Sequence, residues 1–63
     1  MPAVIRFYLT ANRETFVEAH EHYDSRDNEY FAGHMEGGKV HYDNDLTRDE
    51  AADILNKARK GIL

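Results

Sequence analysis

Histidine is the residue type in this chain with the widest chemical range. Neutral imidazole together with carboxylate groups is suitable ligation for zinc or nickel. In a hairpin around Gly37-Gly38, His34 faces His41, and a sheet that also contained residues 15–23 would bring Glu18 and Asp43 close by. The dense ligand spacing of known zinc motifs is missing, so solvent-facing histidines are the favoured interpretation. The alternative is a metal site drawn from His20, His22, His34 and His41.

The carboxylate and hydroxyl side chains do not predict catalysis. Acid pairs such as Glu18 and Glu21 invite general acid–base chemistry, but nothing in the sequence pattern desolvates one member of a pair. Ser25 has no neighbouring base or orienting group. We therefore expect no enzyme activity and no cofactor.

The elements before the glycine pair are less certain than those after it. Residues 3–10 alternate apolar and polar side chains with period two, which predicts a strand. Residues 15–23 fit either a strand, through their β-branched and aromatic residues, or a helix, through their Glu and Ala residues. We favour the strand and keep the helix open. The polar runs 11–14 and 24–28 predict turns.

Residues 30–43 predict a β-hairpin around the two-residue turn Gly37-Gly38. One face would carry Phe31, Gly33, Met35, Val40 and Tyr42. The other face would carry Ala32, His34, Glu36, Lys39, His41 and Asp43. A slip of one residue would exchange the two faces, so the register is strongly specified. We expect the apolar set to lie beneath the final helix and the imidazoles to lie outside.

The last segment predicts a helix with a well-defined start. Thr47 and Glu50 have the spacing of a capping box, and Ala51, Ile54 and Leu55 form an apolar stripe. The predicted fold is α+β: a small antiparallel sheet with the C-terminal helix packed on one face. The order ββββα is preferred, βαββα is the alternative, and residues 1–63 would form a single small domain.

Composition narrows the class of partner. Twelve acidic residues oppose eight basic ones, giving a net charge of −4, and cysteine is absent. This balance disfavours direct binding to nucleic acid and favours a protein partner with a basic surface. Disulfides and thiolate metal sites are excluded. The sequence contains no secretory signal and no run apolar enough to span a membrane, so we expect a cytoplasmic protein.

An aromatic set predicts an interaction surface. Val4, Tyr8, Phe16, Tyr30 and Ala32 are expected to point away from the helix-covered face, where they would form an exposed patch. The predicted partner-binding residues are Tyr8, Phe16, Tyr30, Asp24, Asp27 and Asp45.

The predicted function is that of a small, acidic, non-enzymatic protein-binding module. It would inhibit a partner by covering its basic, nucleic-acid-binding surface, as a virus- or phage-type accessory protein acting on a host nuclease or polymerase would do. A histidine/carboxylate metal-binding protein and an obligate homodimer with a structural role are the alternatives.

Overall fold

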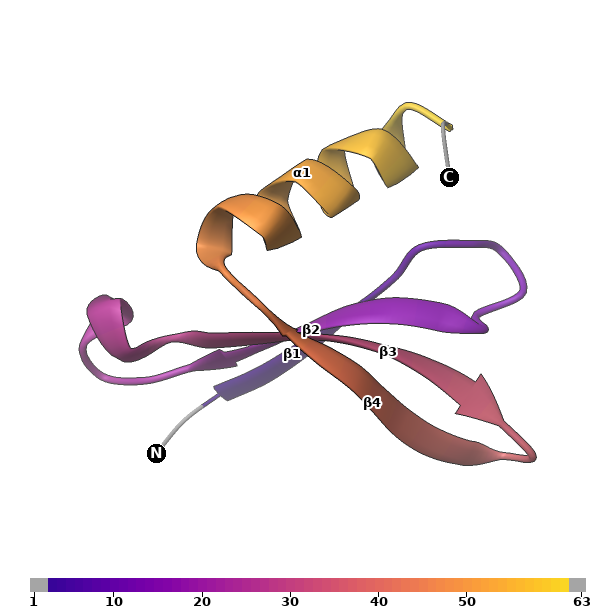
Figure 1. Ribbon diagram of the computed structural model, residues 1–63, viewed down its shortest axis with the longest axis horizontal. Helices are drawn as coiled ribbons and strands as arrows, with labels where there is room; N and C mark the ends of the chain where they lie inside the picture. The colour runs from indigo at the N-terminus through magenta and orange to yellow at the C-terminus, as the bar shows by residue number, and fades with distance from the viewer. Residues whose placement is uncertain (1–2, 62–63) are drawn as a thin grey trace.

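The computed structural model describes residues 3–61 and shows one antiparallel sheet with a helix on one face (Figure 1). The strands are β1 (Ala3–Tyr8), β2 (Thr15–Glu21), β3 (Glu29–Glu36) and β4 (Lys39–Leu46), and the helix is α1 (Arg48–Arg59). The strands lie in chain order, β1-β2-β3-β4. The predicted α+β class and the order ββββα are confirmed, and residues 15–21 form a strand. Among residues 3–61, no helix is long and apolar enough to cross a membrane.

Local sequence explains the turns of the sheet. Gly37 and Gly38 both have positive φ angles, 58° and 76°, which a two-residue hairpin turn of type I′ requires. Glu36 pairs with Lys39 across this turn, as predicted. Between β1 and β2, Arg13 takes the left-handed conformation with a φ of 58°. The Asn12 side chain supports that turn by accepting a hydrogen bond from the backbone N–H of Glu14.

The start of α1 confirms the predicted capping box. The Thr47 side chain accepts a hydrogen bond from the backbone N–H of Glu50 at 3.1 Å. The Glu50 side chain in turn accepts one from the backbone N–H of Thr47 at 2.8 Å. Because β4 ends at Leu46, the helix begins without an intervening loop. The sheet face on which Leu46 lies therefore decides which face the helix covers.

A β-bulge in β4 determines the face on which Leu46 lies. His41 pairs with His34 and Tyr42 with Gly33, but Asn44 then pairs with Ala32, so Asp43 is an extra residue. Beyond the bulge, side chains change face relative to uninterrupted alternation. Leu46 consequently pairs with Tyr30 and lies on the opposite face from Tyr42.

The helix covers the predicted face of β1 and β2, because Val4, Tyr8 and Phe16 point away from it as expected, but it covers the opposite face of the β3–β4 hairpin. The side chains of Tyr30, Val17 and Ala19 line a groove together with Ala51 and Leu55 of α1. The expectation that Phe31, Met35, Val40 and Tyr42 lie beneath the helix is wrong. The expectation that Tyr30 and Ala32 point away from the helix is also wrong, because both share the face of Val17 and Ala19. The physical reason is the bulge, which turns Leu46 and the following helix onto this face.

The core is small and is centred on β2. Phe16, Val17, Glu18 and Ala19 are all buried, so both faces of this strand are covered. Val40 and Tyr42, which we expected in the core, are 37% and 54% exposed. On the face away from the helix, the ring of Phe16 covers Gly33 so closely that a Cβ atom there would collide with Phe16 Cζ. Gly33 thus lies at a bulge and at a close approach of another side chain, the two situations in which glycine is typical inside a strand.

Candidate functional site

The sheet face away from α1, here called the open face, carries the exposed side chains of Val4, Tyr8, Val40 and Tyr42. Strand register places the alternate residues of each strand on it. Val4, Tyr8 and Tyr42 are exposed to 58%, 42% and 54%. Its members are Val4, Arg6, Tyr8, Phe16, Glu18, His20, Glu29, Phe31, Gly33, Met35, Val40, Tyr42 and Asp45.

A buried carboxylate lies at the centre of the open face. Glu18 is 1% exposed, and its carboxylate is hydrogen-bonded to three side chains. Arg6 Nε donates to Oε2 at 2.8 Å, the Tyr42 hydroxyl donates to Oε1 at 2.7 Å, and His20 Nε2 lies 2.8 Å from Oε1. Both carboxylate oxygens are thus used within the fold. Among residues 3–61, no buried side-chain nitrogen or oxygen lacks a partner.

These contacts fix the charge state of Glu18. Burial alone raises the pKa of a carboxylate, because the charged form loses its hydration. The hydrogen bonds from Tyr42, His20 and Arg6 together outweigh this effect, and the pKa of Glu18 is lowered from its ordinary value of 4.5. The hydrogen bond to Glu18 also raises the pKa of Tyr42 above its ordinary value of 10. At neutral pH the charge of Arg6 is therefore balanced by a buried carboxylate.

The aromatic rings beside this network form a shallow hollow of about 270 Å³, here called the aromatic hollow. It is lined by His20, Phe31, Tyr42 and Asp45. Phe31 meets His20 and Tyr42 edge to face, with ring centroids 4.9 and 5.9 Å apart. Asp45 is exposed at the rim, and no ion pair within residues 3–61 involves it. The arrangement combines aromatic walls with one uncompensated negative charge.

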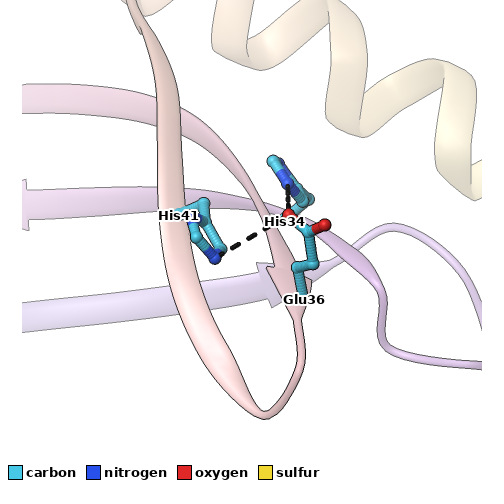
Figure 2. A group of neighbouring side chains, drawn as sticks. All are labelled: His34, Glu36 and His41. Carbon is cyan, nitrogen blue, oxygen red and sulfur yellow. Dashed lines mark ion pairs between the residues drawn. The ribbon is translucent and has the colours of Figure 1, made fainter.

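A second cluster lies beside the hairpin turn on the helix side of the sheet (Figure 2). Nε2 of His34 lies 3.6 Å from Oε2 of Glu36, and Nε2 of His41 lies 3.9 Å from the same oxygen. The two imidazole rings are stacked with centroids 5.1 Å apart and planes 13° apart. One ligand atom from each of the three residues lies within 4.8 Å of the others. We call this group the hairpin cluster.

Asp43 orients one member of the hairpin cluster. Its carboxylate lies 2.9 Å from Nδ1 of His34. This hydrogen bond raises the pKa of the His34 imidazole, with a smaller contribution from Glu36. An N–H at Nδ1 that donates to Asp43 leaves Nε2 of His34 facing Glu36.

The four histidines do not share a face, which contradicts the alternative of one metal site drawn from all of them. The expectation that the imidazoles lie outside the helix-covered face is wrong for His34 and His41. His34 and His41 lie on the helix side, whereas His20 lies on the open face against Glu18. His22 follows the end of β2, where its Nε2 lies 3.0 Å from Glu29. The reason is parity, because His20 pairs across the sheet with Glu29, an odd number of positions from His34 along β3.

The predicted partner-binding residues are spread over three places. Tyr8 lies on the open face and is 42% exposed, whereas Phe16 is 0% exposed beneath the Arg6 guanidinium, whose Cζ lies 4.5 Å from the ring centroid. Phe16 therefore offers a partner no surface. Tyr30 lies on the helix side.

The predicted acidic residues are similarly separated. Asp24 forms an ion pair with Arg26 at 2.7 Å, and Asp27 is exposed in the 3-10 turn η1 (Ser25–Asp27). Asp45 alone joins the aromatic hollow.

Sequence reasoning missed two features of these sites. The pairing of Arg6 with Glu18 is a direct cross-strand contact, which aligning the two predicted strands would have indicated. Glu36 was overlooked as a partner of His34, although a spacing of two residues places both on one strand face.

Comparison with protein-family models, curated proteins and solved structures found no match to this chain. The functional proposal is therefore built on the open face and its charges.

Proposed function

We propose that this chain is a non-enzymatic protein-binding module that captures a partner through a basic surface. In this proposal an arginine or lysine side chain of the partner occupies the aromatic hollow. The observation that supports it most directly is the composition of the hollow, with Phe31 and Tyr42 as aromatic walls and Asp45 at the rim. Aromatic rings within about 6 Å attract a cation, and a carboxylate adds a charge-assisted hydrogen bond.

The local electrostatics favour the same partner. Arg6 is the cation nearest the centre of the open face, and its charge is matched by Glu18 at 2.8 Å. Asp45 then adds an uncompensated negative charge, and the whole chain carries −4. A cationic surface is attracted over a distance and then held by the rings.

The use of Glu18 supports binding rather than catalysis. A catalytic carboxylate needs a free oxygen for the substrate proton. Both oxygens of Glu18 already accept hydrogen bonds from the fold, and Glu18 is 1% exposed. The network shapes and stiffens the open face.

Capture of a basic surface would have a biological consequence. A partner that binds nucleic acid through that surface would be inhibited, because the module would cover it. A virus- or phage-type accessory protein in the cytoplasm that antagonises a nuclease or polymerase is the role that we propose. A second copy of this chain is a poorer occupant, because two acidic chains repel each other.

Binding to peptides of defined charge tests the proposal. We expect an arginine-rich peptide and a lysine-rich peptide to shift the NMR signals of Phe31, Tyr42 and Asp45. An acidic peptide of equal length should leave them unchanged. Light scattering should show a monomer. Peptide-induced shifts confined to α1, or an acidic peptide that binds equally well, would contradict the proposal.

A pair of charge reversals separates the aromatic hollow from general attraction. Asp45→Lys should weaken binding of the arginine-rich peptide at least tenfold, about 1.4 kcal/mol. Glu14→Lys changes the net charge equally in the exposed turn between β1 and β2, and should have little effect. In affinity capture from a host lysate, Asp45→Lys should again bind the partner more weakly than the unaltered chain, and Glu14→Lys should bind it about equally. Equal losses in both variants would show that only net charge matters.

A further inference from the structure

We propose that the hairpin cluster, His34, Glu36 and His41, is a binding site for a divalent transition-metal ion, with zinc as the best-matched metal. This site is separate from the aromatic hollow, because the cluster lies beside the β3–β4 turn on the helix side of the sheet. The inference does not depend on the proposed partner binding.

The ligand atoms already lie close to the spacing that zinc requires. Zinc binds histidine nitrogen at about 2.0–2.1 Å and carboxylate oxygen at about 2.0–2.2 Å in tetrahedral geometry, which separates neighbouring ligand atoms by about 3.4 Å. Oε2 of Glu36 lies 3.6 Å from Nε2 of His34 and 3.9 Å from Nε2 of His41. The ligand atoms of all three residues lie within 4.8 Å of one another, so the two stacked imidazoles would have to turn and move by up to about 1 Å to point at one ion (Figure 2).

The backbone holds the three ligands together. His34 and Glu36 are two residues apart on β3 and share a face, and His41 is the direct cross-strand partner of His34. The Gly37-Gly38 turn fixes this pairing immediately beyond the cluster. The site is therefore largely formed before a metal arrives, which lowers the entropic cost of binding.

Asp43 provides an independent observation in favour of a metal. Histidine ligands in metal sites donate their second ring N–H to a carboxylate or carbonyl group, which fixes the tautomer and ring orientation. The carboxylate of Asp43 lies 2.9 Å from Nδ1 of His34, whereas Glu36 faces the other ring nitrogen, Nε2. Asp43 is thus a positioning residue that leaves Nε2 for the metal.

The donor set also defines the metal class. Two imidazoles and one carboxylate match zinc sites with three protein ligands and suit nickel or copper, but not magnesium or calcium, which prefer oxygen ligands. Partial exposure of the ligands leaves a fourth position for water. A metal ion here would cross-link β3 to β4. Such a cross-link would stabilise a 63-residue chain that has no cysteine for disulfides.

Zinc titration of the whole chain by calorimetry is the primary test. We expect one zinc ion per chain, and we expect His34→Gln and His41→Gln each to weaken binding at least tenfold. His22→Gln is the matched control, because His22 also contacts a carboxylate, Glu29 at 3.0 Å, without a third ligand. The zinc affinity of the His22→Gln variant should equal that of the unaltered chain.

Asp43→Asn tests the positioning role. Zinc affinity should fall about 10- to 100-fold, and the ¹⁵N shifts of the His34 ring should show a change in the ratio of its two tautomers. An affinity loss without a tautomer change would overturn this role.

Thermal unfolding provides a second measurement that does not depend on variants. Zinc at about 100 times its Kd should raise Tm by roughly 10–20 °C, and a chelator should reverse the rise. His41→Gln, checked by circular dichroism for an intact fold, should show no rise. Absence of 1:1 zinc binding in the unaltered chain would overturn the proposal, as would equal weakening by His22→Gln and His41→Gln.

Discussion

Glu18 shows how a single buried charge can organise a sheet face. Its cross-strand partner Arg6 comes from β1, Tyr42 comes from β4, and His20 shares β2. One carboxylate therefore connects side chains of three strands, β1, β2 and β4. The same contacts hold Tyr42 and His20 beside the aromatic hollow.

At the residue scale, Glu18→Gln should lower the free energy of unfolding by about 2 kcal/mol at neutral pH, because hydrogen bonds to a charged group are lost. The pKa of Glu18 is lower in the folded chain than its ordinary value of 4.5. Its stabilising contribution is thus present above about pH 4.5 and is lost as pH falls through the lower folded value. Urea unfolding at several pH values measures both effects.

The free energies of unfolding of Glu18→Gln and of the unaltered chain should therefore differ most at neutral pH. They should converge in acid, where Glu18 is protonated. Glu14→Gln, at an exposed position, is the control and should change stability little at any pH. A constant difference between Glu18→Gln and the unaltered chain down to pH 2 would contradict the ionised-carboxylate interpretation.

At the scale of elements, the bulge at Asp43 explains why correctly predicted strands led to the wrong face of the β3–β4 hairpin beneath the helix. Uninterrupted alternation would place Leu46 on the same face as Tyr42. The extra residue places Leu46 opposite Tyr30 instead. Alternation within residues 30–42 was predictable because it is a local property, whereas the bulge depends on how β4 fits Gly33 and Phe16.

Deleting Asp43 should be tolerated, because it removes the bulge and leaves His41 and Leu46 on their present faces. We expect the free energy of unfolding to change by no more than about 1 kcal/mol. Inserting one serine after Asp43 should instead turn Leu46 to the open face. That change would uncover Val17 and Ala51 and cost at least about 2 kcal/mol.

Urea unfolding and hydrogen exchange of the α1 amides would compare these two variants. Strong protection in the deletion variant and weak protection in the insertion variant are the expected results. Similar protection in both would show that the bulge does not decide the position of the helix.

At the scale of the whole molecule, one helix is too narrow to cover a four-stranded sheet. α1 packs chiefly on β3, with smaller contacts to β2 and β4. Ile5 and Phe7 of β1 remain 39% and 41% exposed, beside a groove of about 250 Å³. Within residues 3–61, the buried side chains are those of Phe16, Val17, Glu18 and Ala19 in β2 and of Ala51 in α1.

Extending the helix side chains toward β1 should therefore stabilise the chain. Ala52 is exposed and lines the groove, so Ala52→Leu should cover part of Phe7 and Ile5. We expect a gain of about 1 kcal/mol and a Tm higher by about 4–8 °C. Ala52→Gln, which has similar helix propensity without the apolar cover, is the control. An equal Tm in the two variants would contradict this prediction.

The sequence by itself determined the features that depend on neighbouring residues. Period-two alternation defined the strands, the glycine pair defined the hairpin turn, and Thr47 with Glu50 defined the start of the helix. The pairing of His34 with His41 followed from the same turn. These features were predictable because each is stabilised within a short stretch of chain.

Only the tertiary structure decided which face the helix covers and which side chains meet across the sheet. One extra residue at Asp43 turned Leu46, and with it the helix, onto the face of Tyr30. The same extra residue brought Asp45 to the aromatic hollow. The separation of His20 from His34 came instead from the pairing of β2 with β3, and the burial of Glu18 came from contacts across three strands. Such contacts depend on strand order and on the close fit of Phe16 over Gly33, and no local pattern encodes them.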